Sequence, residues 1–242
     1  MSKSRARRTR SDGLTETISK FSLIGAKGRK RLDEDSVREA IELCREIFRT
    51  TLRDAGFEER KITALLTKFV DAGRRSAPWK PTSGRVPGRP QDGADGNRIK
   101  RWLLPSDHKF FATEVDATLV EIRYMLQAMS MAGFPSIAGK ELLDSWSWLN
   151  NGHRVNQGDY LDPIQLVPIG FRDVFENPRQ VTSGHIYPLD RGGKHVPDNT
   201  FLTLAISNNL QGNNTVEELL NMMWAIVNRH QSEGDWKPPR PA

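Results

Sequence analysis

The chain has 242 residues, of which 37% are hydrophobic and 27% charged, with a formal net charge of +6. This length suits one large or two small domains, and the composition lies within the globular range. The single cysteine, Cys44, excludes an intrachain disulfide and a cysteine-based zinc knuckle. No apolar run approaches the roughly 18 residues of a membrane span, and no apolar signal segment follows the first basic residues. These features indicate a cytoplasmic protein that does not bind a membrane.

The positive charge is concentrated at the start of the chain. Residues 1–32 hold ten of the 36 basic and two of the 30 acidic residues, so this arm carries +8 and the remainder −2. We predict that residues 1–33 are a disordered basic arm, because few large apolar residues interrupt its Lys, Arg, Ser and Thr. Such an arm binds phosphate backbones with little sequence preference. A solubilising tail is the alternative interpretation.

Residues 34–150 predict a helical region. Ser36 and Glu39 have the spacing of a capping box, and apolar residues follow at helical intervals until Gly56. A second, shorter helix ends before Gly73. The patterns over 107–131 and 139–150 predict a third and a fourth helix.

A long loop at residues 73–101 interrupts this region, and Gly, Pro, Arg and Lys dominate it. Loops of this length are usually functional or disordered. Its basic residues and Trp79 suit a segment that follows a DNA groove, and a solvated linker explains the same composition.

The C-terminal part predicts the order strand, loop, strand, helix. Val181–Tyr187 is the first expected strand, and residues 190–198 form a loop with Gly192 and Gly193 at its turn. Phe201–Leu204 is the second strand, and a helix opens near Asn208. A last helix begins with a second capping box at Thr215. Residues 151–233 are thus one unit, and residues 234–242 are a Pro-rich tail.

The run from Ser183 to Asn199, continued through Asn208, resembles the HNH nuclease motif, also called the ββα-metal motif. His185 matches the general-base histidine, Asn199 the middle asparagine that orders the loop, and Asn208 the last letter, a metal ligand. Fourteen positions separate His185 from Asn199, and nine separate Asn199 from Asn208. The family's Arg-Gly-Gly turn and Gly-Asn-x-Thr ending are also present, at Arg191–Gly193 and Gly212–Thr215. The resemblance implies a hairpin and a helix that hold one divalent metal, Mg²⁺ or Mn²⁺, against the scissile phosphate while His185 activates water.

Two positions depart from the family's pattern. Gly184 stands where the family usually has the first metal ligand, Asp or His. Four acidic residues nearby are candidate substitutes, and water can fill further positions on magnesium; they are Asp173, Glu176, Asp190 and Asp198. Leu204 and Ser207 stand where many members have zinc-knuckle cysteines. Packing against the N-terminal helices must therefore hold the unit together.

The sequence as a whole predicts a mostly helical α+β protein with a small C-terminal HNH module. The hypothesis is a metal-dependent endonuclease that hydrolyses DNA, by analogy of a restriction or phage type, with no small-molecule cofactor. A homodimer is expected if its target site is symmetric. Six residues are the expected DNA contacts: Arg74, Arg75, Lys80, Arg191, Lys194 and His195.

Two other functions fit the same sequence. One is a non-catalytic DNA-binding or assembly protein with a degenerate HNH fold, which Gly184 favours. The other is a toxin-like nuclease that cuts RNA or any DNA without sequence preference.

Overall fold

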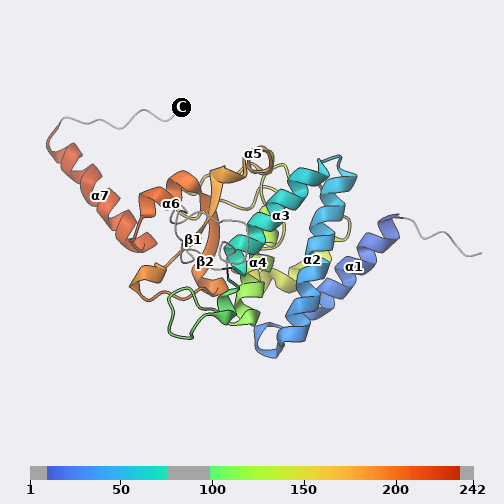
Figure 1. Ribbon diagram of the computed structural model, residues 1–242. Helices are drawn as coiled ribbons and strands as arrows, with labels where there is room; N and C mark the ends of the chain where they lie inside the picture. The colour runs from blue at the N-terminus through green and yellow to red at the C-terminus, as the bar shows by residue number, and fades with distance from the viewer. Residues whose placement is uncertain (1–9, 76–98, 235–242) are drawn as a thin grey trace, which may run out of the picture.

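The computed structural model describes residues 10–75 and 99–234 and is mostly helical, with one small antiparallel sheet (Figure 1). The predicted α+β class is therefore confirmed. The α-helices of the described residues are α1 (Arg10–Gly25), α2 (Glu34–Asp54), α3 (Glu59–Gly73), α4 (Glu114–Met129), α5 (Phe171–Glu176), α6 (Ala205–Gln211) and α7 (Val216–Ser232). The strands are β1 (Val181–His185) and β2 (Thr200–Leu204), and residues 140–150 form a 3-10 helix, η3 (Lys140–Asn150).

Helix α1 contradicts the predicted disorder of residues 1–33 over its described part. Ile18, Phe21 and Ile24 recur at helical spacing and are buried in the main core. The Phe21 ring stacks on Trp146 of η3 with 4.6 Å between ring centroids, and Trp146 Nε1 donates a hydrogen bond to the Phe21 carbonyl. Three buried apolar side chains are enough to dock this helix, whose other side chains are mostly polar. The overall composition of residues 1–33 does not reveal their spacing. Residues 1–9 lie outside the described residues.

The predicted helices are present with changed ends. The N-cap of α2 is Asp33, about one turn before the expected cap Ser36. The Asp33 carboxylate accepts a hydrogen bond from the Ser36 amide at 2.8 Å, in place of the expected capping box of Ser36 with Glu39. A carboxylate suits this position because a helix N-terminus favours negative charge. Helix α4 begins only at Glu114, after Thr113 as its cap. The fourth predicted helix is a 3-10 helix rather than an α-helix.

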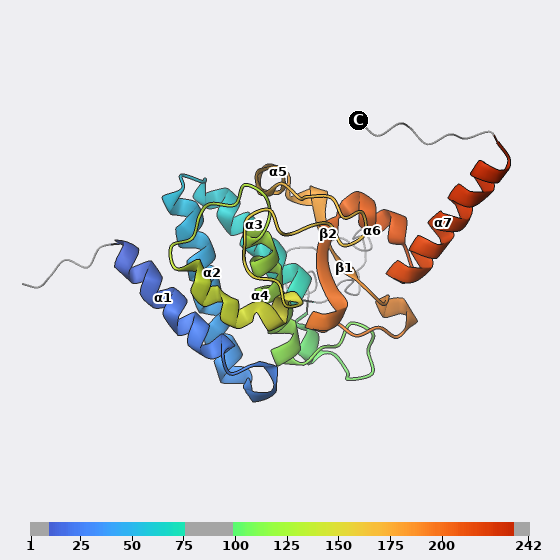
Figure 2. The same cartoon turned by 180° about the vertical axis from the view of Figure 1, so that it is seen from behind.

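Helix α4 is the centre of the molecule. It packs against α2 and α3 and also contacts β2, and it lies in the middle of the molecule (Figure 2). All of its residues from Ala117 to Met129 are buried, including polar and charged ones. The charge of Glu121 is compensated by Arg45 of α2, whose Nε lies 2.9 Å from Glu121 Oε1. This helix is therefore the shared wall between the helical layer and the small sheet.

The predicted strand–loop–strand–helix order is present at residues 181–211. Strands β1 and β2 pair antiparallel, with Gly184 opposite Phe201 and His185 opposite Thr200. Strand β1 ends at His185, two residues earlier than predicted, and α6 begins directly after β2. The sheet is small, so its position depends on the helices around it.

Helix α7 projects away from the rest of the molecule (Figures 1 and 2). Its N-terminus has the predicted capping box between Thr215 and Glu218. Of its residues only Leu219 is buried, and large apolar side chains are exposed along it: Leu220, Met222, Met223, Trp224 and Ile226.

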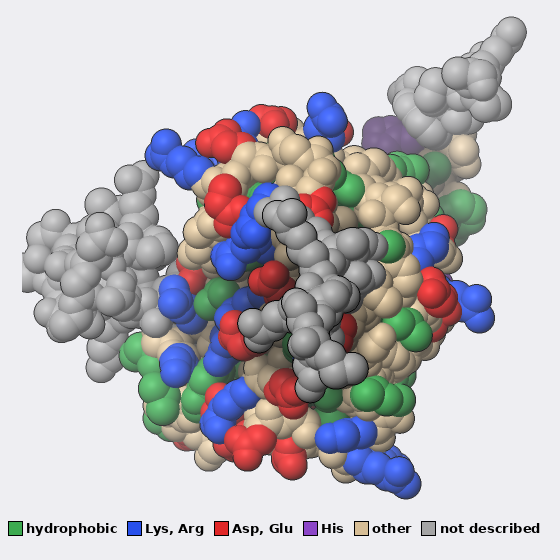
Figure 3. Space-filling model, turned by 90° about the vertical axis from the view of Figure 1, so that its right-hand side faces the viewer, with side chains coloured by type: hydrophobic (Ala, Val, Ile, Leu, Met, Phe, Trp, Pro, Cys, Tyr) green, Lys and Arg blue, Asp and Glu red, His purple; other side chains and the backbone are tan. Residues whose placement is uncertain are grey.

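The surface over α1 and α2 mixes both signs of charge, because Lys and Arg side chains alternate with Asp and Glu (Figure 3). Two ion pairs on this side are Lys20 with Glu16, and Arg38 with Glu114. The described part of the N-terminal region is thus not a uniformly basic surface. None of the helices in residues 10–75 and 99–234 has the length and apolarity to cross a membrane.

Candidate active site

His185, the predicted general base, lies at the end of β1 and lines a cleft of about 550 Å³. The cleft is bounded by the sheet on one side and by α3 on the other. Lys68 and Asp71 of α3 line it together with Ser183 and Arg101. The cleft therefore brings a histidine, a carboxylate and two cations together.

His185 belongs to a chain of hydrogen bonds that crosses the molecule. Its Nε2 lies 3.2 Å from His195 Nδ1, and His195 Nε2 lies 2.8 Å from the Gly73 carbonyl at the end of α3. A carbonyl only accepts, so His195 Nε2 carries a proton and donates it to Gly73. In a neutral His195, Nδ1 must then accept from His185 Nε2. This assignment leaves His185 Nδ1 without a proton and able to take one.

Both histidines are held neutral at physiological pH. Burial, with a smaller contribution from the Arg101 charge, lowers the pKa of His185 to about 4. Burial lowers the pKa of His195 well below its usual value, and Arg101 and His185 act in the same direction. A base must be unprotonated before it can act, and this environment keeps His185 in that form.

Asn199 fixes the backbone that follows His185. Its Oδ1 accepts from the Tyr187 amide at 2.8 Å, and its Nδ2 donates to the carbonyls of Tyr187 at 2.9 Å and Lys194 at 2.8 Å. These bonds join the two ends of the loop between the strands. The loop-ordering role that the HNH resemblance implies for Asn199 stays a prediction.

Gln211 is a site residue that the sequence did not predict. It is buried on α6, and its Nε2 donates to the His185 carbonyl at 2.7 Å and to the Asn214 carbonyl at 3.0 Å. Asn208, the predicted metal ligand, lies one helical turn before Gln211 and so shares its face of α6. Glutamine has no place in the HNH letters, so only the fold reveals this contact.

Gly184 leaves no room for the family's usual first ligand. A Cβ built there would lie 2.5 Å from Phe201 Cε2 and 3.1 Å from Thr203 Cγ2. An aspartate or histidine at this position would require the Phe201 ring to move. The departure of Gly184 from the family's pattern is therefore built into the packing of the sheet.

The four candidate substitutes do not assemble a metal site beside His185. Asp198 pairs with Arg29 at 2.5 Å, Asp190 with Lys109 at 2.5 Å, and Glu176 with Lys61. Asp173 lies at the start of α5, beside Gly170.

Within the described ranges no three His, Cys, Asp or Glu side chains gather as a metal would require. The carboxylate that lines the cleft is Asp71, which pairs with Arg75 at 2.9 Å. The donors around His185 thus do not by themselves complete a site for Mg²⁺ or Mn²⁺.

The expected DNA contacts differ in how available they are. Lys194 is exposed, whereas Arg74 lies over the Trp102 ring and is mostly buried. Arg75 pairs with Asp71, and Arg191 forms a two-pronged pair with Glu218. Each of these arginines would have to exchange an existing partner for a phosphate.

His195 is fully buried, so the prediction that it contacts DNA is wrong; its ring instead links His185 to Gly73. Lys80 lies outside the described residues.

Lys68 is a second site residue that the sequence did not single out. Its Nζ donates to the carbonyls of Pro178 and Val181, which bracket the start of β1. Burial lowers the pKa of its ammonium to about 8. No local pattern marks Lys68, and only the sheet docked against α3 gives it a role.

Comparison with known proteins gives little further information. No protein family matches the chain, and no curated protein matches it. One solved chain, described as "Crystal structure of a type II restriction endonuclease", is similar at 18% identity and a TM-score of 0.43. The similarity covers 55% of this chain and 62% of that one, so this chain matches less than two thirds of that protein's length. A similarity this remote assigns neither an activity nor a substrate.

Proposed function

We propose that this protein is a nuclease of the HNH type that hydrolyses DNA phosphodiester bonds, with His185 as the general base. The hydrogen-bond chain from His185 through His195 to Gly73 carries this proposal. It fixes the tautomer of His185, and burial keeps the ring neutral. A histidine in this state accepts a proton from an attacking water.

The other residues of the cleft support the same chemistry. Gln211 holds the His185 carbonyl and Asn199 holds the backbone of Tyr187, so both support the chain at and just after the base. Lys68 and Arg101 line the cleft as cations and would attract a phosphate. Lys194 adds an exposed cation in the loop between the strands.

A divalent cation, Mg²⁺ or Mn²⁺, remains part of the proposal through the HNH resemblance alone. Asn208 would be a ligand from α6, and the cation would neutralise charge on the phosphate. The described donors do not complete its coordination. We therefore assign the residues of the chain no step that depends on the metal.

The proposed assembly is a homodimer that meets through α7. Five large apolar side chains of this projecting helix are exposed, far more than a helix facing water usually carries. Its first turn is acidic at Glu217 and its last turn basic at Arg229. Two copies packed antiparallel would place these opposite charges together.

Cleavage of supercoiled plasmid and phage DNA tests the proposal. We expect DNA cuts in Mg²⁺ or Mn²⁺, none in EDTA, and a loss of roughly a hundredfold or more in His185→Ala, in line with the contribution of a general base. His230→Ala, which removes an exposed histidine of α7, is the matched control and should cut normally. Equal cleavage by wild type and His185→Ala would refute the assigned base. Discrete fragments would indicate sequence specificity, and a smear would indicate the nonspecific alternative.

A non-catalytic DNA-binding protein is the second candidate, and the packing of Gly184 against Phe201 favours it. This candidate predicts DNA retardation in a gel with no cleavage in any metal. It also predicts that His185→Ala leaves the affinity for DNA unchanged.

A further inference from the structure

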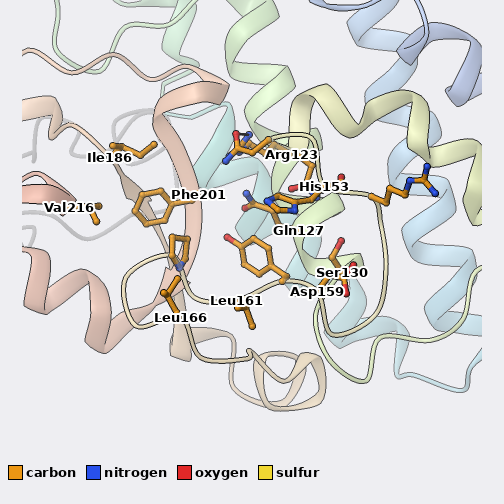
Figure 4. A pocket seen from close by; sticks show the side chains of 15 residues that line it. Arg123, Gln127, Ser130, His153, Asp159, Leu161, Leu166, Ile186, Phe201 and Val216 are labelled. Atoms are coloured by element: carbon orange, nitrogen blue, oxygen red, sulfur yellow. Dashed lines mark hydrogen bonds between the residues drawn. The ribbon is translucent and has the colours of Figure 1, made fainter. Parts of the chain in front are cut away.

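The molecule has a second cavity, separate from the cleft of His185 but sharing the same sheet. Its volume is about 490 Å³, within the usual size of small-molecule sites. Phe201 and Ile186 line this cavity, whereas Ser183 and His185 line the cleft. Figure 4 shows Arg123, Gln127 and His153 on one side of it and Phe201, Ile186 and Val216 on the other. The cavity thus has a polar wall and an apolar wall.

Arg123 is the unusual group of the polar wall. It extends from α4 and is only 2% exposed, yet no carboxylate of the described residues forms an ion pair with it. One Nη donates to the Leu149 carbonyl and to Asn151 Oδ1, while its Nε is buried without a hydrogen-bond partner. By contrast, Arg45 on α2 meets the buried Glu121 directly. A buried guanidinium without a counter-ion is costly, and a bound anion would compensate it.

The backbone around the cavity carries strain. Asn151 and Leu166 are the non-glycine residues at positive φ in the described chain, both at 56°, and both line this cavity. Leucine rarely adopts this conformation, and such strain concentrates at ligand sites. Asn151 is also the residue that holds Arg123.

The apolar wall limits what the anion is attached to. Tyr160 and Phe201 both line the cavity, and the Tyr160 hydroxyl donates a hydrogen bond to the Leu202 carbonyl at 2.6 Å. Leu161 and Leu166 extend the apolar surface toward solvent. Flat apolar groups pack well against such rings.

We propose that this cavity binds a small oxyanion, carboxylate or phosphate, carried on a flat aromatic body of about the size of a nucleoside. The guanidinium of Arg123 holds the anion, and the walls formed by Tyr160 and Phe201 hold the aromatic body. This site is independent of the nuclease activity, because it needs neither His185 nor a metal.

Isothermal titration of the full-length protein in EDTA tests the site, with nucleoside 5′-monophosphates and indole-3-acetate as probes. Adenosine and indole-3-acetamide are the matched neutral analogues. We expect at least one anionic probe to bind at one site per chain. Its neutral analogue should bind with an affinity at least about tenfold lower. Arg123→Gln should reduce the affinity by a similar factor, and Arg60→Gln, at an exposed arginine of α3, should leave it unchanged.

Two further variants keep the result clear. Leu166→Asp changes an exposed wall residue, so it should fold normally and repel the anionic probe even if Arg123→Gln does not fold. His185→Ala should bind the probe as the wild type does, which separates this site from the cleft. No binding of any probe at millimolar concentration, or equal binding of charged and neutral analogues, would overturn the proposal.

Discussion

The residues around His185 determine its tautomer and its pKa. His195 fixes which ring nitrogen carries the proton, and burial, helped by the Arg101 charge, keeps the ring uncharged. Neither neighbour is an acid, so the pair differs from a histidine that a carboxylate orients and charges. The cost of this arrangement is that two neutral histidines must remain buried at every pH at which the protein works.

The stability of the fold should therefore fall on the acid side of neutrality. The pKa values of both histidines are lower in the folded protein than the ordinary value of about 6.5. Above that pH the histidines are neutral in both the folded and the unfolded chain, so they do not make the free energy of unfolding depend on pH. Below it the unfolded chain binds more protons, and stability declines until the folded-state pKa values are passed.

Urea unfolding at pH 7.5, 6.0 and 5.0 measures this effect. Each histidine should contribute a decline approaching about 1.4 kcal/mol per pH unit below pH 6. Its substitution should flatten the profile, so His195→Gln should lose less stability between pH 7.5 and 5.0 than wild type. His108→Gln, at an exposed position, is the control, and a parallel profile for His195→Gln would contradict the assignment.

Asn199 gives a second prediction at the residue scale. Asn199→Ala removes hydrogen bonds to Tyr187 and Lys194, so the free energy of unfolding should fall by about 2–3 kcal/mol. Cleavage should fall with it, because the backbone after His185 loses its support. Asn209→Ala, on the exposed side of α6, should change the denaturation midpoint little.

The sequence marks His185, Asn199 and Asn208 as candidate site residues but does not indicate their partners. The spacing of His185, Asn199 and Asn208 is local, and the resemblance to a short motif carries it. The Gly73 carbonyl fixes the tautomer of His195, and the Arg101 charge helps to lower the pKa of His185; both residues lie more than 80 positions from His185. No local pattern contains such contacts, which is why His195 was interpreted as a DNA contact.

At the scale of elements, α1 shows that a few buried apolar side chains are enough to dock a helix. Phe21 is fully buried and stacks on Trp146, whose indole nitrogen bonds back to the Phe21 carbonyl. The apolar residues of α1 are diluted by Ser, Thr and Lys, so composition favoured disorder. The helical spacing of Ile18, Phe21 and Ile24 was the signal that would have found it.

Truncation of Phe21 should therefore destabilise the fold strongly. We expect Phe21→Ala to lower the free energy of unfolding by about 3–5 kcal/mol, as for other large core aromatic side chains. Leu23→Ala, on the same helix but 71% exposed, should change it by less than about 0.5 kcal/mol. Equal effects in chemical denaturation would mean that α1 is not docked.

Helix α7 gives the opposite case, an element that the sequence predicted and whose exposed apolar side chains find no partner among the described residues. In the proposed dimer, Trp224→Ser together with Met223→Ser should convert the species seen by light scattering from dimer to monomer. Asn228→Ser, on the same helix, is the control. A wild-type protein that is monomeric at all concentrations would exclude assembly through this helix.

At the scale of the whole molecule, the small sheet is tied to the helical layer from several directions. Lys68 of α3 bonds to the start of β1, Gln127 of α4 accepts from the Leu202 amide, and His195 reaches Gly73. The absence of zinc-knuckle cysteines predicted this dependence. The sequence could not say which helices supply the support, because each link joins segments distant in the chain.

These links predict a single cooperative unfolding transition. Far-ultraviolet circular dichroism and tryptophan fluorescence should give coincident denaturation curves, as in a two-state protein. Lys68→Met should shift both curves together. A separate early transition in wild type would show that residues 151–234 unfold as an independent domain.

The Gly73 carbonyl limits how the C-terminal residues could be transferred to another protein. It accepts from His195 and from the Nε of Arg101, so the end of α3 sets the proton on a ring more than a hundred residues later. A C-terminal fragment grafted onto another protein would keep the HNH letters and lose that carbonyl. Its His185 ring would be free to exchange tautomers, so the fragment would keep the residues of the motif and lose the hydrogen bond that fixes the position of their proton.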